Sequence, residues 1–363
     1  MHAAILTEEL GWHRTGWAIR LGHSDSISKV FLSDPSGKNA DLVSQAVGDK
    51  LGGVYSSPEE LLEQHKIQMA VVTMAPSRMP DAVLAALEAG AHVLVEKPGA
   101  TSPDAYAPLV ELANARGLLL TMALIADSPV VREAARIVSE GTLGRIYGMN
   151  YLSMDHQRWR RRHDFGWVFS GEQAGGGILS HLACHYLHSM RRILGEEIVE
   201  VTGFADVVCG EPLEVEDTIV LCVRFAGGAV GVLHSGYWGP TPYQPVETEV
   251  QSISPAGTLI MSDSVKPALL PEDRSSAQSR GFRLWGERGC ISANSDSGQF
   301  TLDLQADLKG GTGHLGEPSD RHVIKRWETN LSHAVGPEGE DPFFQAFLDA
   351  VRGECDPPNS NED

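Results

Sequence analysis

Three histidines stand within one short apolar segment, GGGILSHLACHYLH, residues 175–188. His181, His185 and His188 are spaced i, i+4 and i+7. At about 3.6 residues per turn, this spacing predicts that all three imidazoles lie on one side of a helix. Imidazole exchanges protons near neutral pH and is also a common metal ligand. The segment is therefore a candidate site of either proton transfer or metal binding.

A zinc ion is the less favoured interpretation of this helix. Positions i and i+7 are two turns apart, roughly 10 Å along the axis, which one ion seldom bridges. His181 and His185 could share an ion only with an outside ligand such as Asp155 or His156. Proton transfer requires no such span, so we expect no metal at these histidines.

One basic stretch, QRWRRRHD at residues 157–164, stands out in an acidic chain. Arginine side chains bind carboxylate and phosphate groups through two parallel hydrogen bonds. The stretch is therefore either a solvated loop or a subunit contact paired with acidic side chains, or a binding site for an anionic substrate. The candidate substrate-binding residues are Arg158, Trp159, Arg160, Arg161, Arg162 and, on the histidine helix, Tyr186.

The composition limits the class of protein. A chain of 363 residues is long for one hydrophobic core, so two domains are expected. A net charge of -19 argues against nucleic acid and anionic membranes as partners, because both attract clustered positive charge. Five cysteines without a C-x-x-C pair indicate reduced thiols. With no signal-peptide pattern or membrane-length apolar run, we expect a cytoplasmic protein.

Residues 1–124 alternate short apolar runs with helical patterns, which predicts a parallel sheet covered on both faces. This is the doubly wound α/β architecture of dinucleotide-binding (Rossmann) domains. Ser57 with Pro58 predicts one helix start, and Gly117 predicts one helix end. The expected strands are 2–6, 29–34, 69–74, 92–98 and 118–124, and the expected helices are 40–48, 56–64, 80–90 and 102–117.

Residues 125–363 show a different pattern, typical of an α+β domain with an open, mostly antiparallel sheet. The region 306–342 is rich in Gly, Asp, Glu and His and is interpreted as loop. One face of such a sheet needs a cover, so we expect a homodimer or homotetramer formed through it. The expected elements are a helix at 128–141 and strands at 146–154, 197–209, 217–238 (a hairpin turning at Gly227-Gly228), 246–255, 282–295 and 299–305.

Two motifs together resemble a known family. VLVEKPGA, followed about 80 residues later by GGGILSHLACHYLHSMRRILG, resembles the Gfo/Idh/MocA family, the glucose-fructose oxidoreductase and inositol dehydrogenase group. VEDTIVLCVRFAGGAVGVLHSG is similar to the sheet of that family's second domain. The resemblance extends over nearly the whole chain and implies the same two-domain fold.

The resemblance implies an NAD(P)-dependent active site between the two domains. Lys97 of the E-K-P motif is expected beside the nicotinamide, where it and a histidine take a hydroxyl proton while hydride leaves the carbon. The family motif G-G-G-x-x-x-D-x-G-x-H-x-x-D retains its histidine here as His185. His181 and His188 replace its two aspartates, and Ala183 replaces a glycine. Lys97, His185 and His181 are therefore the predicted catalytic residues.

The dinucleotide loop departs from the usual fingerprint. G-x-G-x-x-G lets backbone N–H groups approach the pyrophosphate, but this chain has LTEELGWHRTG, with Thr7 and Glu9 where the first two glycines belong. Asp34, at the end of the second strand, is placed to hold the ribose 2′-hydroxyl, which favours NAD over NADP. The expected cofactor-binding residues are Asp34, Gly11, Trp12, His13, Pro76, Glu96 and Lys97.

Three functions are compatible with these features. The first is an NAD-dependent oxidoreductase acting on a hydroxyl of a sugar, polyol or sugar acid. The second is an NAD-dependent glycoside hydrolase or lyase that oxidises, eliminates, hydrates and reduces with recycled NAD, for which His181 could supply an additional acid or base. The third is a non-catalytic sugar or nucleotide sensor, which the missing glycines favour and the intact E-K-P motif disfavours.

Overall fold

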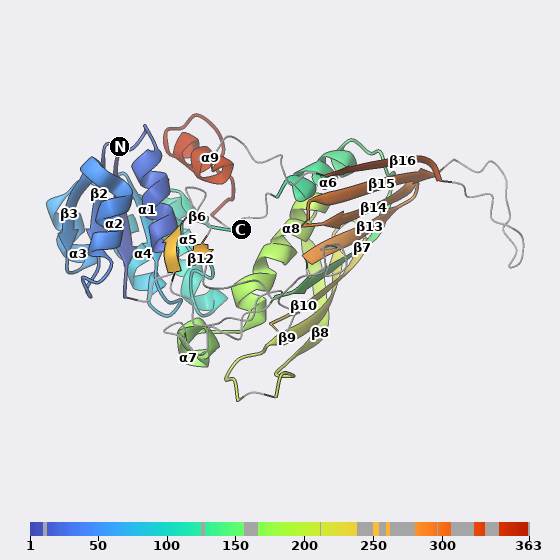
Figure 1. Ribbon diagram of the computed structural model, residues 1–363, viewed down its shortest axis with the longest axis horizontal. Helices are drawn as coiled ribbons and strands as arrows, with labels where there is room; N and C mark the ends of the chain where they lie inside the picture. The colour runs from blue at the N-terminus through green and yellow to red at the C-terminus, as the bar shows by residue number, and fades with distance from the viewer. Residues whose placement is uncertain are drawn as a thin grey trace, which may run out of the picture.

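The computed structural model describes residues 1–9, 13–124, 128–155, 166–210, 212–237, 250–253, 259–261, 280–295, 297–305, 323–330 and 341–361. In Figure 1 the N-terminal sheet and its helices lie at one end, and a second, larger sheet lies at the other. The long helix α8 (Cys184–Leu194) lies against the second sheet, on the side that faces the first domain. Some predicted site residues lie outside the described residues: Gly11, Trp12, His156, Arg158, Trp159, Arg160, Arg161 and Arg162.

The first sheet has six parallel strands in the order β3-β2-β1-β4-β5-β6, which confirms the predicted Rossmann architecture. The strand order reverses between β1 and β4, and ligands of such sheets bind beyond the carboxyl ends of the strands at that point. The strands are β1 (His2–Thr7), β2 (Lys29–Ser33), β3 (Leu51–Tyr55), β4 (Met69–Thr73), β5 (His92–Val95) and β6 (Leu120–Met122).

Helices cover both faces of this sheet. One apolar cluster joins α3 (Pro58–Gln64), α4 (Met79–Glu88) and α5 (Pro103–Arg116) to it, and a second cluster joins α1 (Arg14–His23) and α2 (Ala40–Val47) to the opposite face. A short helix η1 (Gly48–Lys50) leads from α2 into β3. Ser57 caps α3 by accepting a hydrogen bond from the backbone N–H of Glu60, and Gly117 ends α5 in the left-handed conformation, as predicted.

Strand β3 was not expected from the sequence, because LGGVY carries two glycines and little strand signal. Gly52 explains the composition: a Cβ atom there would lie 2.4 Å from the ring of Phe31 on the adjacent β2. The glycine therefore lets the edge strand lie directly against a buried aromatic ring.

The second sheet has eight strands in the order β16-β15-β14-β13-β7-β10-β9-β8. Only β7 and β10 pair in parallel among its described strand pairs, so the expectation of a mostly antiparallel sheet is confirmed. The predicted hairpin turns at Gly228, whose φ is +90°. The strands are β7 (Ile146–Met154), β8 (Ile198–Asp206), β9 (Thr218–Phe225), β10 (Val230–Gly236), β13 (Arg280–Gly286), β14 (Gly289–Asn294), β15 (Gln299–Gln305) and β16 (Val323–Asn330).

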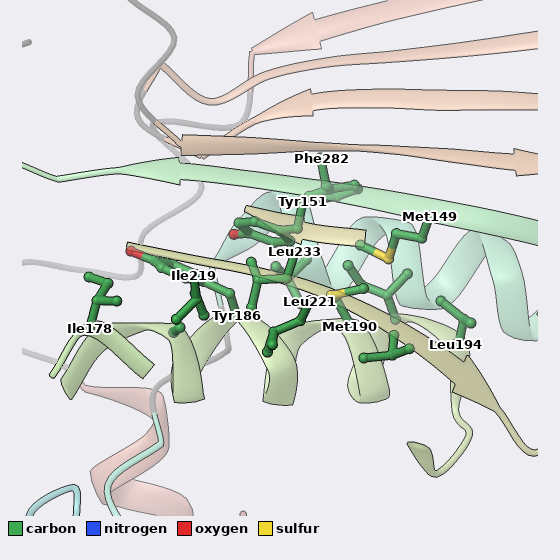
Figure 2. Close-up of a cluster of buried hydrophobic side chains, with 14 of the residues drawn as sticks. Met149, Tyr151, Ile178, Tyr186, Met190, Leu194, Ile219, Leu221, Leu233 and Phe282 are labelled. Atoms are coloured by element: carbon green, nitrogen blue, oxygen red, sulfur yellow. The ribbon is translucent and has the colours of Figure 1, made fainter. Parts of the chain in front are cut away.

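One face of the second sheet is covered by α6 (Pro129–Ser139) and α8. Alternate strand residues such as Met149, Leu221 and Leu233 point at α8, where Met190 and Leu194 meet them (Figure 2). The remaining described elements are η3 (Gly166–Phe169), α7 (Gly171–Ala174), η4 (Leu179–Ala183), and a two-stranded sheet of β11 (Val250–Ile253) and β12 (Leu259–Met261).

The expectation that residues 306–342 form loop is wrong for one segment. β16 pairs antiparallel with β15 and ends the sheet. Arg326, Trp327 and Glu328 are exposed, as befits an edge strand. The polar composition of β16 therefore reflects solvent exposure rather than the absence of regular structure.

The end of the chain returns to the first domain. Helix α9 (Pro342–Val351) inserts Phe343, Phe344, Phe347 and Leu348 into the cluster formed by α1 and α2 (Figure 1). Residues 359–361 then follow β6: the side chain of Asn361 accepts a hydrogen bond from the N–H of Leu120 at 2.9 Å. A segment that the sequence assigns to the second domain thus completes the core of the first domain. The domain boundary at residue 124 stays a prediction.

Candidate active site

Lys97 stands at the carboxyl end of β5, next to the strand-order reversal. Only 8% of its surface is exposed, and it precedes Pro98 through a cis peptide bond. Its ammonium group donates a hydrogen bond to the main-chain carbonyl of His181, 84 residues further along the chain. The two motifs that suggested a reaction centre therefore meet in the structure.

Trp17 of α1 holds the side chain of Glu96, the residue before Lys97. The indole Nε1 of Trp17 donates to Glu96 Oε1 at 2.7 Å, and the backbone N–H of Lys97 lies 3.3 Å from Oε2. Trp17 is 1% exposed and Glu96 is 6% exposed. These contacts orient the turn that carries Lys97. A contact of Glu96 with the cofactor stays a prediction, and Trp17 was not found by the sequence reasoning.

The three glycines before the histidine helix allow close approach of two backbones. A Cβ atom on Gly177 would lie 1.8 Å from the carbonyl oxygen of Glu216, and one on Gly175 would lie 2.3 Å from that of Thr101. The carboxylate of Glu216 accepts hydrogen bonds from the N–H groups of Gly177 and Leu179 at 2.9 and 3.0 Å. The helix start is thus pressed against the segment that follows the E-K-P motif.

The histidine helix does not begin as a regular α-helix, so its three imidazoles do not share one set of neighbours. Residues 179–183 form a π-helical turn, which is wider than an α-helical one and shifts the phase of the helix. His181 is 4% exposed, and its Nδ1 lies 2.7 Å from the hydroxyl of Tyr237, the residue after β10. His188 Nε2 lies 3.0 Å from Asn359 Oδ1 in the C-terminal segment.

His185 lies between these two, and its ring faces positive charge. Burial, then the charges of Lys97, His13 and His188, lower the pKa of His185 well below its usual value. Its Nδ1 is buried and has no hydrogen-bond partner among the described residues. The imidazole is therefore neutral at pH 7 and able to accept a proton.

Asp34 is 2% exposed at the end of β2, where the sequence predicts a ribose contact. Its carboxylate accepts hydrogen bonds from the backbone N–H of Ser36 (3.0 Å) and Asn39 (2.8 Å) and from the Ser36 hydroxyl (2.7 Å). Burial lowers the pKa of Arg14, and the nearby charge of Asp34 acts in the opposite direction. Ribose binding by Asp34 stays a prediction.

The acidic side chains in the cofactor loop are engaged by protein groups. Glu8 accepts a hydrogen bond from the N–H of Ala75 at 2.6 Å, and Glu9 forms an ion pair with Lys38. His13 has φ 58°, the only positive φ of a non-glycine residue in the described part of the chain. Its left-handed backbone is the conformation that a glycine would otherwise supply in such a loop.

These features fit a dinucleotide at the carboxyl edge of the first sheet. Asp34, His13 and Lys97 lie at the ends or loops of β2, β1 and β5, around the reversal point. Pro76 is buried just after β4 at the same edge. Glu9 is paired with Lys38, so it does not present an unopposed charge to a pyrophosphate.

Tyr186, the described member of the predicted substrate set, lies in the core between α8 and the second sheet. It is 8% exposed and stacks on Tyr151 with the ring centroids 5.0 Å apart (Figure 2). Its hydroxyl donates to Asp155 at 3.1 Å, and burial, followed by the charge of Asp155, raises the Tyr186 pKa far above its usual value. A substrate contact for Tyr186 stays a prediction, whereas its structural contacts are extensive.

The described residues contain no group of three or more His, Cys, Asp or Glu side chains arranged to hold a metal ion. In the same part of the chain, no helix combines the length and apolar character needed to cross a membrane. Asp155, considered above as an outside zinc ligand, instead accepts hydrogen bonds from Ser153 and Tyr186.

Comparison with known families matches both domains. Residues 18–124 match the oxidoreductase family model with an NAD-binding Rossmann fold, and residues 131–253 match the GFO/IDH/MocA C-terminal domain. The chain therefore belongs to the Gfo/Idh/MocA family of oxidoreductases, and its nucleotide-binding domain is of the NAD-binding type.

Curated relatives share moderate sequence identity. The chain is 24% identical to a 1,5-anhydro-D-fructose reductase of Ensifer adhaerens over 267 residues, 70% of this chain and 78% of the relative. It is 26% identical to a myo-inositol 2-dehydrogenase of Thermotoga maritima over 191 residues, 51% of this chain and 55% of the relative. The second match spans about half of that relative's length.

Solved structures show the same fold over the whole chain. A levoglucosan dehydrogenase in complex with NADH and levoglucosan superposes with a TM-score of 0.73 at 16% identity, covering 100% of this chain and 93% of the other. An oxidoreductase from Agrobacterium radiobacter, in complex with NAD+, L-tartaric acid and magnesium, gives 0.72 at 15% identity, with 100% and 92% covered.

Proposed function

We propose that this protein is an NAD-dependent oxidoreductase that interconverts a hydroxyl and a carbonyl on a sugar or polyol. Its relatives include a reductase of an anhydro sugar and an inositol dehydrogenase. A structural neighbour holds NADH together with levoglucosan. The contact between Lys97 and the backbone of His181 is the observation that carries the proposal, because it holds the lysine beside the helix that carries His185, at the carboxyl edge of a Rossmann sheet.

In the oxidation direction, the substrate hydroxyl loses its proton to the protein and its carbon loses a hydride. The bound nicotinamide supplies the hydride acceptor. Lys97 donates hydrogen bonds to the substrate oxygen and stabilises the developing alkoxide. His185 accepts the proton at Nε2, because its Nδ1 is excluded from solvent. Asp34 and His13 hold the dinucleotide from β2 and the first loop.

The NAD-recycling glycosidase alternative relied on His181 as an additional acid or base. The His181 ring is 4% exposed, and its Nδ1 is occupied by Tyr237. Because Tyr237 already binds this nitrogen, the contact does not support the additional acid or base that the glycosidase needs. That the substrate is an anionic sugar stays a prediction, because it rests on the arginine stretch and this stretch lies outside the described residues.

A direct assay tests the proposal. NADH formation is measured with levoglucosan and myo-inositol, and NADH consumption with 1,5-anhydro-D-fructose. Aryl glycosides are tested in parallel, because their cleavage with no net NADH would indicate the glycosidase instead. Lys97→Met is expected to lower kcat at least about 100-fold, the usual scale for loss of a donor that stabilises a developing oxyanion. Lys29→Met, at an exposed lysine, is the control and keeps full activity. A wild-type protein that binds no dinucleotide, or a fully active Lys97→Met, would overturn the proposal.

We also propose that two copies of the chain associate through the open face of the second sheet. Side chains exposed on this face include Phe204 (81%), Val230 (51%) and Leu152 (40%). Two hollows of about 580 and 540 Å³ lie along it, lined in part by Trp285 and Arg283. Exposed large apolar side chains beside surface hollows are typical of a subunit interface.

A further inference from the structure

The buried pair formed by His181 and Tyr237 has no place in the proton transfer described above. Tyr237 is fully buried, and its ring makes an edge contact with Phe169 at a centroid distance of 5.7 Å. Its backbone N–H donates to the carbonyl of Asp217 at 2.9 Å. The tyrosine is therefore fixed through both its backbone and its ring, and its hydroxyl is a fixed point for the imidazole of His181.

His181 is held at two places with different consequences. Its ring is bound to Tyr237, and its main-chain carbonyl receives the ammonium group of Lys97. The carbonyl belongs to the π-helical turn 179–183, where carbonyl groups are displaced from the regular α-helical ladder. The orientation of that carbonyl therefore depends on how the turn is held, and the imidazole is one of its anchors.

We propose that Tyr237 is a positioning residue for Lys97. By binding the His181 ring it holds the π-helical turn, and through the carbonyl of that turn it sets where the Lys97 ammonium rests. The proposal rests on the role given to Lys97 in the proposed function. Other groups facing the ammonium are His185 and Cys184 of α8, and Glu96 is its neighbour in the turn.

The imidazole of His181 is suited to this contact. Its Nδ1 lies 2.7 Å from the hydroxyl of Tyr237, the residue that follows β10. A buried imidazole without this partner would lose a hydrogen bond that the surrounding apolar core cannot replace. Tyr237 therefore fixes one rotamer of His181 and one shape of the turn.

Tyr237→Phe tests the proposal, because it keeps the buried ring and removes only the hydroxyl. We expect kcat to fall about 10-fold or more, the KM for NAD to stay unchanged, and the pH dependence of kcat to shift. Tyr151→Phe is the matched control, since Tyr151 is also buried and its hydroxyl lies 3.3 Å from Ser295. His181→Gln should reproduce the shift, and the double variant should add little to it.

A second readout does not depend on turnover. In protein with isotope-labelled lysine, the side-chain resonance of Lys97 is assigned with Lys97→Arg, and its titration is followed in each variant. Tyr237→Phe and His181→Gln should move that titration, and Tyr151→Phe should leave it in place. If Lys97 titrates identically in all of them, the positioning role is wrong. If the titration moves but wild type oxidises no sugar or polyol, the proposed function fails and the positioning role stands.

Discussion

At the scale of single residues, the proposed reaction depends on a histidine that stays neutral inside a positive environment. His185 is surrounded by Lys97, His13 and His188, and burial adds to their effect on its pKa. A cationic imidazole at this point would repel the ammonium group of Lys97. A neutral one can accept a proton while Lys97 supplies the positive charge that an alkoxide needs.

This neutrality has a measurable effect on stability. The folded-state pKa of His185 lies below the unfolded-state value of about 6.5, so the unfolded chain binds the proton more tightly. The contribution of this neutral histidine is fully present above that value and is lost as the pH falls below it. Between about pH 7.5 and 5, wild type should lose unfolding free energy. Over the same range, His185→Gln should lose about 1–2 kcal/mol less than wild type does.

Urea denaturation at the two pH values measures this difference. His23→Gln is the control, because His23 is exposed at the end of α1. Equal acid sensitivity of wild type and His185→Gln would show that His185 is already protonated in the folded protein.

The sequence predicted which residues approach one another at the site, but not what holds them. Lys97 and His185 follow from two motifs, and the structure brings both to one edge of the first sheet. Tyr237 and Asn359 lie 56 and 171 residues from their histidine partners, and nothing in their local sequence indicates the contact. Such pairs are set by the fold as a whole.

At the scale of elements, glycine and helix type decide the geometry of the site. Helical spacing predicted three imidazoles on one side of a regular helix. The π-helical turn instead sends His181 to Tyr237 and His188 to Asn359. Sequence periodicity does not reveal such a turn here, because a segment this short has too few apolar positions to show a single shift of helical phase.

Gly177 provides the element-scale prediction. Gly177→Ala places a methyl group 1.8 Å from the carbonyl of Glu216, so a backbone must move. We expect a loss of roughly 2–4 kcal/mol in unfolding free energy and a large loss of activity. Gly171→Ala is the matched control, since the nearest atom to its Cβ would be 3.9 Å away. Thermal unfolding and NADH turnover measure both effects, and equal behaviour of the two variants would refute the role given to the glycines.

At the scale of the whole molecule, the chain crosses between its two domains more often than its sequence suggests. Patterning alone predicted the two sheets, because alternating β and α units are local features. The packing of α9 on the first domain was not predictable in that way, since an apolar helix face does not specify its partner. Asn359 completes the connection by linking β6 to His188 of α8.

The open face of the second sheet gives the last prediction. Strand register pairs Phe204 with Val220, Val220 with His234, and His234 with Leu152. All four side chains therefore lie on the same face of the sheet, away from α8. Phe204→Glu should raise the dimer dissociation constant at least about tenfold, because a charge must then be buried in the contact. Sedimentation velocity over a range of concentrations measures the constant. Leu42→Glu, at an exposed apolar residue on α2, is the control and should not change association. A wild-type chain that stays monomeric, or a Phe204→Glu variant that associates as tightly as wild type, would place the interface elsewhere.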